Sequence, residues 1–390
     1  MTGLPRGFAY HFDEPDDGPP QSRIGRADTP HGSFAVPAFF PVGTRASVRT
    51  LDSRDLVECG ASGLLANAYH LMLRPGASVI AGLGGLHRFM AWDKPILTDS
   101  GGFQAMSLGG KATDDGVVFK SIYDGSFHEL TAEGAVLVQE QLGPDFAVAL
   151  DLCPALPSSP EIVEDAMRRS IAWSARGRDA HSRPDQALVG VVQGGVDPDL
   201  RIESATKMTS IGFDVFAVGG LAVGEPVEEM LSTLDVVVPH LPNDRLRYLM
   251  GVGDPYGIVE AVARGIDLFD CVLPTRLARH GTALTSSGKL NLRAASLATS
   301  DAPIDLKCDC RTCSQYSRAY LRHLLSVGEE LGKRAITIHN LRFLLGLMES
   351  IRESLANGTF DAIRREIASS WRPSLEPGSV DHAIARHGGQ

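Results

Sequence analysis

Three cysteines and one histidine form the pattern in this chain whose chemistry is easiest to define. Cys308, Cys310 and Cys313 lie within six residues of sequence, and His339 follows after a predicted helical stretch. Three thiolates and an imidazole supply four soft ligands, the number that a closed tetrahedral zinc site requires. Such a site has no open position, so we expect one structural Zn2+ per chain that helps the surrounding short helices to fold. Three incidental core cysteines are the alternative, which their clustering disfavours.

Polar residues at the ends of short apolar runs form a second candidate site. Asp99, Asp151 and Gln193 each follow such a run, and Asp270 ends another. Carboxylates brought close together repel, so one can keep its proton while another stays ionised. That difference suits a general acid/base and a nucleophile, as in glycosyl transfer through a covalent sugar ester. Any one of these residues could equally be a solvated loop residue, so the prediction depends on their convergence.

The apolar runs predict the scaffold that would bring these residues together. Short runs alternate with helical stretches, which indicates βα units on a parallel sheet. Eight such units predict an α/β fold of the (β/α)8 TIM barrel type, whose active site lies at the C-terminal ends of the strands. A hairpin with an Asp124-Gly125 turn is inserted between the third and fourth runs. The runs are residues 38–42, 63–66, 95–98, 146–150, 187–192, 215–218, 247–250 and 268–270.

The chain divides into four predicted segments. We expect a flexible acidic leader over residues 1–24, the catalytic barrel over 25–280, a zinc-binding helical subdomain with closing helices over 281–371, and a tail over 372–390. The leader has neither the basic nor the apolar segment of a secretion signal, and no apolar run reaches membrane-spanning length. With 43% hydrophobic and 22% charged residues, the composition is that of a soluble globular protein. We therefore expect a cytoplasmic protein without membrane contact.

Charge is distributed unevenly along the chain. The net charge of −10 argues against a nucleic-acid partner, yet residues 276–334 contain ten Lys and Arg against five Asp and Glu. This excess predicts a basic face beside the zinc segment, with Arg276, Arg279 and Lys289 as candidate phosphate contacts. A merely solvated charged surface is the alternative.

Five motifs and the Cys/His tetrad, in the same order, resemble the bacterial tRNA-guanine transglycosylase family. The resemblance extends from about residue 25 to residue 371. It implies a (β/α)8 barrel with a C-terminal zinc subdomain. It also implies exchange of the wobble guanine of tRNAs with GUN anticodons, those for aspartate, asparagine, histidine and tyrosine, for a 7-deazaguanine in queuosine biosynthesis. The motifs are Asp99-Ser-Gly-Gly-Phe-Gln104, Val192-Gln-Gly194, Ala217-Val-Gly-Gly-Leu-Ala-Val-Gly-Glu225, Leu249-Met-Gly-Val-Gly253 and Phe269-Asp-Cys-Val-Leu-Pro-Thr-Arg276.

The resemblance also implies roles for single residues. Asp270 matches the nucleophile that attacks the ribose C1′, and Asp99 matches the general acid/base that protonates the departing guanine. Further positions match residues that contact the base, two of them as apolar plates above and below it. From the sequence alone, plain core packing would be the simpler role for those two. The base-edge positions are Asp151, Gln193 and Gly220, and the plates are Phe103 and Met250.

The pocket wall indicates which modified base is used. Val223 and Cys153 match positions that hold bulky residues in relatives using 7-aminomethyl-7-deazaguanine (preQ1). Relatives that accept queuine have glycine at the position of Val223. A valine placed there would clash with the larger arm of queuine. We expect the backbone carbonyl of Leu221 to accept from the aminomethyl group, with Glu225 orienting that peptide.

Two other functions remain open at this point. A catalytically silent tRNA-binding subunit would keep the fold and the zinc, but the presence of both Asp99 and Asp270 argues against it. A retaining glycosidase would use the same carboxylates but has no need of a zinc module. The expected partners are the tRNA anticodon loop, guanine, preQ1 and a second copy of the chain. A homodimer could form through an exposed apolar helix at residues 341–355.

Overall fold

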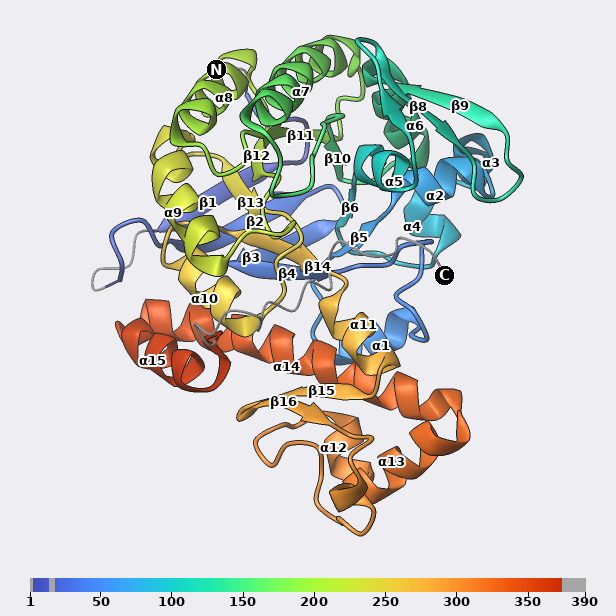
Figure 1. Cartoon of the computed structure of the whole chain (residues 1–390), viewed down its shortest axis with the longest axis vertical. Coiled ribbons are helices and arrows are strands. Elements are labelled where there is room, and N and C mark those ends of the chain that lie inside the picture. Colours follow the sequence, from blue (N-terminus) through green and yellow to red (C-terminus); the bar gives the residue numbers. More distant parts are fainter. Residues whose placement is uncertain (1–2, 14–17, 374–390) are drawn as a thin grey trace.

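A parallel sheet of eight strands forms the centre of the molecule (Figure 1). The computed structural model describes residues 3–13 and 18–373, and within them the order of this sheet is β4-β14-β13-β12-β11-β10-β6-β5. A parallel bridge between Val42 and Leu65 joins the two outer strands, so the sheet closes and the predicted (β/α)8 barrel is confirmed. Its strands are β4 (Ala38–Pro41), β5 (Leu64–Ala66), β6 (Ile96–Thr98), β10 (Phe146–Val148), β11 (Ala187–Val192), β12 (Val215–Val218), β13 (Leu246–Leu249) and β14 (Leu268–Cys271).

Helices follow the strands and cover the outside of the barrel. Local sequence marks where some of them begin. Pro160 is the first residue of α7, and the Asp254 carboxylate caps α10 by accepting from the Gly257 N–H at 2.7 Å. The helices are α1 (Ser53–Glu58), α2 (Ala68–Leu73), α3 (Ala77–Gly82), α4 (Gly85–Phe89), α5 (Gly102–Ser107), α6 (Ala132–Leu142), α7 (Pro160–Ala180), α8 (Pro198–Ile211), α9 (Val227–Val237), α10 (Pro255–Val262) and α11 (Leu273–Arg279).

Alternate residues of each strand fill two different cores. Leu97, Val191 and Leu268 belong to a cluster inside the barrel, whereas their neighbours Ile96, Val192 and Phe269 belong to the cluster between the strands and the helices. This follows from the two-residue period of a strand, and burial on both faces explains why the runs are almost continuously apolar.

A small antiparallel sheet covers the N-terminal end of the barrel. It consists of β1 (Ala9–Asp13), β2 (Ile24–Thr29) and β3 (Gly32–Val36). Phe8 contacts Phe146 at 5.5 Å between ring centroids, and Phe34 contacts Phe40 at 5.1 Å, so aromatic rings close this end. Part of the predicted flexible leader is therefore a strand. Its partner β2 lies beyond the acidic segment, which is why the composition of the leader alone did not indicate it.

The predicted hairpin lies between β6 and β10. It consists of β8 (Gly116–Lys120) and β9 (Phe127–Thr131), with β7 (Lys111–Ala112) paired to β8. Gly125 in the turn has φ +76°, a backbone conformation that glycine adopts without strain.

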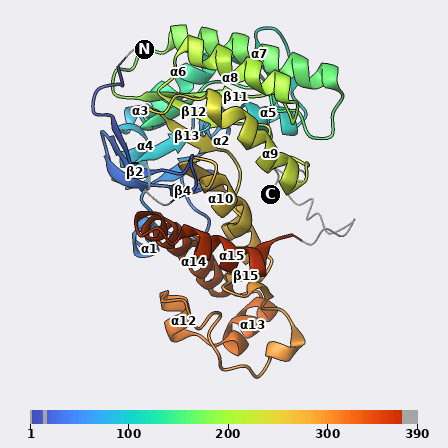
Figure 2. The same ribbon diagram turned by 90° about the vertical axis from the view of Figure 1, so that its left-hand side faces the viewer.

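The elements after α11 form a second layer below the barrel (Figure 2). The 27-residue helix α14 connects the two parts, and one apolar face of it is buried, with Leu341, Leu344 and Ile351 each 0% exposed. The expectation of an exposed dimer helix at residues 341–355 was therefore wrong, because this apolar face covers the barrel of its own chain. The elements are β15 (Thr282–Thr285), β16 (Gly288–Asn291), α12 (Arg311–Gln315), α13 (Arg318–Val327), α14 (Glu330–Ala356) and α15 (Phe360–Trp371).

Two further expectations concern membrane-spanning helices and the C-terminal tail. No helix in the described ranges is both long enough and apolar enough to cross a membrane. The predicted tail over residues 372–390 lies outside the described residues from position 374 onward.

Candidate active site

The barrel mouth brings together the polar residues that the sequence placed at strand ends. Asp99, Gln193 and Asp270 each lie two residues after an inward-facing apolar residue of β6, β11 or β14, so the strand period directs them inward above the core. Ser100, the residue after Asp99, contacts Asp151 Oδ1 at 3.5 Å, and Asp151 is bonded in turn to Gln193 at 2.7 Å, so these strand ends meet in one region. The predicted convergence is therefore present in the structure.

Asp99 is held by the loop after β5. Its carboxylate accepts a short hydrogen bond from the Asn67 side-chain amide and a 2.8 Å bond from the Ala68 N–H at the start of α2. Burial raises the pKa of Asp99 to about 7, and the charges of Asp270 and Asp151 add to the rise while the two hydrogen bonds oppose it. A carboxyl with this pKa exchanges protons readily near neutral pH.

Asp270 has a different set of partners. The Tyr248 hydroxyl donates to its Oδ1 at 2.5 Å, and the Gly251 N–H donates to the same oxygen at 3.0 Å. Burial raises the pKa of Asp270, and these two hydrogen bonds favour its ionised form. Because both donors bind Oδ1, the other carboxylate oxygen keeps its electron pairs available.

Asp151 and Gln193 form a joined pair on the other side of the mouth. The Gln193 Nε2 donates to Asp151 Oδ2 at 2.7 Å, and the Ser100 hydroxyl contacts Asp151 Oδ1 at 3.5 Å. Burial raises the pKa of Asp151 to about 6. Gly220 completes this corner: a Cβ there would lie 2.3 Å from Gln193 Oε1, and its φ of +67° also favours glycine.

The loop between β12 and α9 is fixed by Glu225. Its carboxylate accepts from the Ala222 N–H in a short bond and from the Val223 N–H at 3.1 Å. The Ala222 N–H belongs to the same peptide as the Leu221 carbonyl, so Glu225 orients that peptide as expected from the sequence. Val223 also meets the loop after β10, because its carbonyl accepts from the Leu156 N–H at 3.4 Å.

Phe103 and Met250, the two predicted apolar plates, each lie in the segment that follows a barrel strand. Phe103 lies in α5, directly after the loop that carries Asp99, and is 43% exposed. Met250 follows β13 and is partly buried against the barrel interior. The exposure of Phe103 argues against a plain core role for that side chain.

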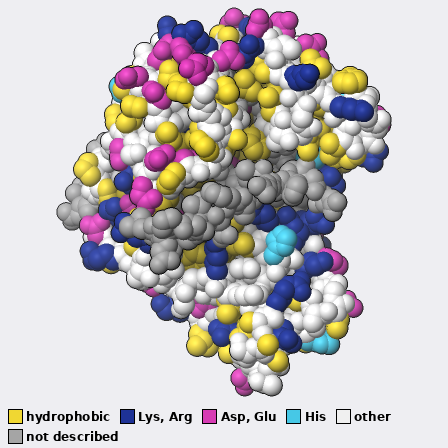
Figure 3. Space-filling model, viewed as in Figure 1, with side chains coloured by type: hydrophobic (Ala, Val, Ile, Leu, Met, Phe, Trp, Pro, Cys, Tyr) yellow, Lys and Arg dark blue, Asp and Glu magenta, His cyan; other side chains and the backbone are white. Residues whose placement is uncertain are grey.

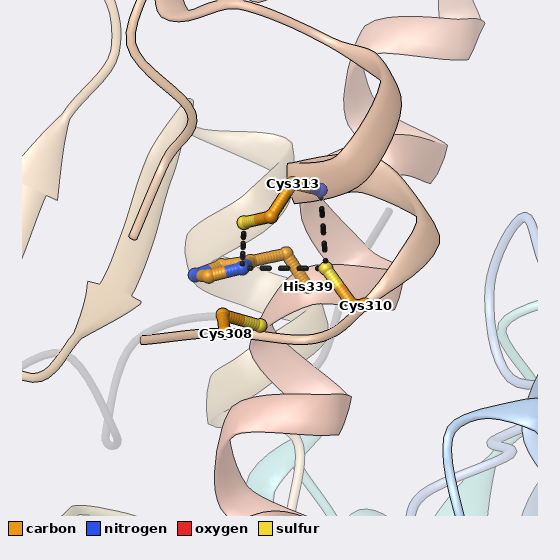
Figure 4. Close-up of side chains that lie close together, drawn as sticks. All are labelled: Cys308, Cys310, Cys313 and His339. Carbon is orange, nitrogen blue, oxygen red and sulfur yellow. Dashed lines mark hydrogen bonds between the residues drawn. The ribbon is translucent and has the colours of Figure 1, made fainter. Parts of the chain in front are cut away.

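The four predicted metal ligands form one cluster in the second part of the chain (Figure 4). Their ligand atoms lie within 4.8 Å of one another, with His339 Nδ1 3.3 Å from Cys313 Sγ and 3.6 Å from Cys310 Sγ. The other ring nitrogen, Nε2, faces the Leu284 carbonyl at 2.7 Å, which fixes the ring orientation and leaves Nδ1 for a metal. The donor set therefore fits a structural zinc ion.

Basic residues border the mouth on the side of the second part. Arg276 and Arg279 lie in α11, the helix that follows the strand carrying Asp270. Burial lowers the pKa of Arg279, and the neighbouring charges of Arg49 and Arg276 lower it further, so three guanidinium groups are gathered there. Figure 3 shows Lys and Arg side chains along the junction between the barrel and the lower part.

Other members of the predicted basic segment serve the fold instead. Arg311 and Arg334 both pair with Asp55 of α1, and Arg318 donates to the carbonyls of Pro303 and Ile304. The excess of positive charge in the sequence therefore overstates the surface that is open to an anionic partner.

A comparison with known protein families identifies the group to which this barrel belongs. A family model described as queuine tRNA-ribosyltransferase matches residues 18–373. The chain belongs to this family. Curated relatives named queuine tRNA-ribosyltransferase include one from Moorella thermoacetica, 50% identical over 92% of this chain and 96% of its own length. A relative from Herpetosiphon aurantiacus is 47% identical over 97% of this chain and 94% of its own length. One from Halothermothrix orenii is 49% identical over 90% of this chain and 95% of its own length.

Three side chains of this queuine tRNA-ribosyltransferase family member were not among the site residues predicted from its sequence. Asn67 and Tyr248 hold the two carboxyls, and fully buried Arg201 donates to the carbonyls of Val192, Gly195 and Gly219 at 2.7–2.8 Å. Arg201 thus fixes the loops that carry Gln193 and Gly220. The position of Asn67 at the end of a strand could have indicated a site residue. Tyr248 lies within a strand and Arg201 within a helix, and neither has a sequence position that indicates a role at the site.

Proposed function

We propose that this chain is a tRNA-guanine transglycosylase that exchanges the wobble guanine of its tRNA substrates for preQ1. Membership of the queuine tRNA-ribosyltransferase family supports a pentosyl transfer on tRNA. The observation that carries the proposal is the carboxyl pair at the mouth, Asp99 with a pKa raised to about 7 and Asp270 within electrostatic reach of it. Such a pair suits an acid/base and a nucleophile acting on one glycosidic bond.

Asp270 acts as the nucleophile. Tyr248 and Gly251 engage its Oδ1, so the other oxygen attacks C1′ of the ribose. The bond between C1′ and guanine breaks as the ester between the ribose and Asp270 forms. The incoming base then displaces the carboxylate from C1′, and two successive inversions give net retention.

Asp99 moves the protons in both halves of the exchange. It donates a proton to the departing guanine and later accepts one from the incoming base. A pKa of about 7 leaves both protonation states populated near neutral pH, which the two opposite steps require.

The joined pair of Asp151 and Gln193 binds the edge of the base, with Gly220 lining the same corner. Phe103 and Met250 stack on its faces, which offsets part of the cost of taking the base out of the anticodon loop, about 1–3 kcal/mol per stacked base. The Leu221 carbonyl, oriented through Glu225, accepts from the aminomethyl group of preQ1.

The proposal also covers the tRNA substrates, the metal and the assembly of the chain. The tRNAs are those with GUN anticodons, held at their anticodon loop by Arg276, Arg279 and Lys289. Cys308, Cys310, Cys313 and His339 hold one Zn2+, which stabilises the fold and takes no part in the transfer. We further propose a homodimer that acts in the cytoplasm in queuosine biosynthesis.

Incorporation of radiolabelled guanine into unmodified tRNA with a guanine wobble base tests the reaction. We expect incorporation by the wild-type protein and a covalent protein–RNA adduct on denaturing gels. Asp270→Asn should lose the adduct and lower exchange by about 10⁴-fold or more, because the nucleophile is gone. Asp165→Asn, at an exposed carboxylate of α7, is the matched control and should exchange normally.

Either of two results would contradict the proposal. An adduct that persists in Asp270→Asn would assign the nucleophile to another residue. A wild-type protein that binds tRNA but incorporates no guanine would be a silent binding subunit.

A further inference from the structure

A second cluster of metal-ligating side chains lies at the opposite end of the barrel from the active site. His31 belongs to the turn between β2 and β3, His87 to α4, and Asp145 immediately precedes β10. The N-terminal ends of the strands and the small sheet that covers them meet at this point. The cluster is therefore separate from Asp99 and Asp270, which follow the C-terminal ends of their strands.

The three side chains converge on one point. Their ligand atoms lie within 4.8 Å of one another, with His31 Nδ1 2.9 Å from Asp145 Oδ1 and His87 Nε2 3.1 Å from Asp145 Oδ2. The imidazole rings are stacked, 3.5 Å between centroids and 14° between planes. Because the lone pair of a ring nitrogen lies in the plane of its ring, one ring must rotate out of the stack for both nitrogens to bind the same ion. The two nitrogen–oxygen distances are a few tenths of an ångström shorter than the separation of about 3.3 Å between ligand atoms bound tetrahedrally to zinc.

Asp145 is a buried carboxylate whose environment suits a cation. Its side chain is 0% exposed, and the two imidazoles are its ion-pair partners among the described interactions. The Ile96 N–H donates to Oδ2 at 2.9 Å, the kind of backbone contact that orients a ligating carboxylate. A buried carboxylate requires compensating positive charge, which a divalent ion between it and the imidazoles would supply.

Backbone hydrogen bonds hold the turn that carries His31, and both histidines are accessible to solvent. The His31 N–H donates to Thr29 Oγ1 at 3.2 Å, and the Thr29 hydroxyl donates to the Gly32 carbonyl at 2.9 Å, which holds the turn. The side chains of His31 and His87 are 37% and 12% exposed, so solvent reaches the cluster. Arg183 lies near His31 but is paired with Asp185 at 2.8 Å, which reduces its repulsion of a cation.

We propose that His31, His87 and Asp145 form a second metal site that binds one divalent cation of the borderline class, with Zn2+ as the representative ion. Two imidazoles and one carboxylate are ligands that suit zinc, cobalt and nickel, and water completes the coordination. The ion joins the β2–β3 turn to α4 and to the start of β10. It is structural, because it clamps the covering sheet to the barrel and lies away from the substrate mouth.

Cobalt distinguishes this site from the Cys3His cluster. We add Co2+ to the protein whose Cys3His cluster already holds zinc, and follow visible absorption. Binding at the second site gives d–d bands without the intense thiolate-to-cobalt charge-transfer band of a cysteine site, because its ligands are nitrogen and oxygen. Elemental analysis after zinc loading should give about two zinc ions per chain, and Zn2+ should raise the melting temperature.

Matched histidine variants test the assignment. His31→Gln and the double variant His31→Gln/His87→Gln should lose the nitrogen–oxygen cobalt bands and the thermal shift, and the double variant should bind about one zinc per chain. His240→Gln, at an exposed histidine of another surface, should behave like the wild type. His31 is partly exposed, so its single variant should fold even if the double variant does not.

Two results would overturn the proposal. A wild-type protein that holds about one zinc per chain at saturating Zn2+, with no new cobalt bands, would make the cluster a set of hydrogen bonds only. Cobalt bands that persist in His31→Gln and in the double variant would place the ion elsewhere.

Discussion

Three carboxyls of similar sequence context receive different properties from their immediate neighbours. Asp99 accepts from an amide and a backbone N–H, Asp270 from a phenol and a backbone N–H, and Asp151 from Gln193. Burial raises the pKa of all three, to about 7 for Asp99 and to about 6 for Asp151. At neutral pH, Asp99 therefore carries a proton more often than Asp151, which suits it to proton transfer.

The raised pKa of Asp99 has a consequence for stability that can be measured. Between pH 4 and pH 7 the folded protein keeps a proton that the unfolded chain releases, so this contribution to stability is fully present at low pH and is lost as pH rises toward 7. The Asp99→Asn variant has no carboxyl at this position, so its stability should not fall with pH for this reason. The difference in free energy of unfolding between variant and wild type should shift in favour of the variant by about 1–3 kcal/mol from pH 5 to pH 8.

Urea denaturation across that pH range measures the difference. Asp165→Asn, a change at an exposed carboxylate of α7, is the control for the loss of one acidic side chain. A parallel curve for Asp99→Asn as well would show that the pKa of Asp99 is not raised.

At the scale of elements, we propose that two segments after barrel strands set the selectivity of the site. The loop from β12 to α9 carries Val223, whose backbone is bonded to Glu225 and to Leu156. Helix α11 directly follows β14, the strand that carries Asp270, and contains Arg276 and Arg279. Both segments follow strand ends, so the barrel positions specificity and chemistry by the same means.

Val223→Gly tests whether the loop excludes the larger base. The backbone contacts of Val223 do not need its side chain, so the loop should keep its shape while the wall opens. In competition assays with labelled guanine, preQ1 should displace guanine in the wild type, and queuine should compete only in the variant. The steric cost in the wild type should be about 1–3 kcal/mol, and Val223→Ala should be intermediate. Efficient use of queuine by the wild type would refute this role.

Arg279→Ala tests whether α11 contacts tRNA phosphates. Binding should weaken, and the slope of log affinity against log salt should flatten by about 0.7, the value for one contact to a single strand. Fluorescence anisotropy with labelled anticodon stem-loop at several salt concentrations measures both. Arg168→Ala, at a 68% exposed side chain of α7, is the matched control. Unchanged affinity of Arg279→Ala at low salt would exclude this contact.

At the scale of the whole molecule, α14 makes one folding unit of two parts. Its first half carries His339 of the metal cluster, and its second half contributes Leu344 and Ile351 to the barrel's outer core. Asp55 of α1 adds ion pairs to Arg311 and Arg334 across the same junction. Loss of the metal should therefore affect the edge of the active site through α14 and α11, which pack together.

Cys310→Ser tests this coupling. Replacing a thiolate ligand should lower zinc affinity by more than about tenfold and reduce tRNA binding along with it. Elemental analysis and anisotropy on the same preparation measure the two effects. Cys153→Ser, outside the metal cluster, should keep its zinc. A zinc-free Cys310→Ser protein with full activity would show that the metal is not needed for the fold.

The sequence alone determined the features that depend on local patterns. Continuous apolar runs defined the barrel strands and the residues at their ends, and the short spacing of Cys308, Cys310 and Cys313 defined most of a ligand set. The tertiary structure decided what depends on distant partners. His31 and Asp145 are 114 residues apart in sequence, and Tyr248 and Asp270 are 22 residues apart on neighbouring strands. The apolar face of α14 packs against the barrel. Periodicity specifies which face of an element is apolar, but only packing determines what lies against that face and how burial shifts the pKa of its carboxyls.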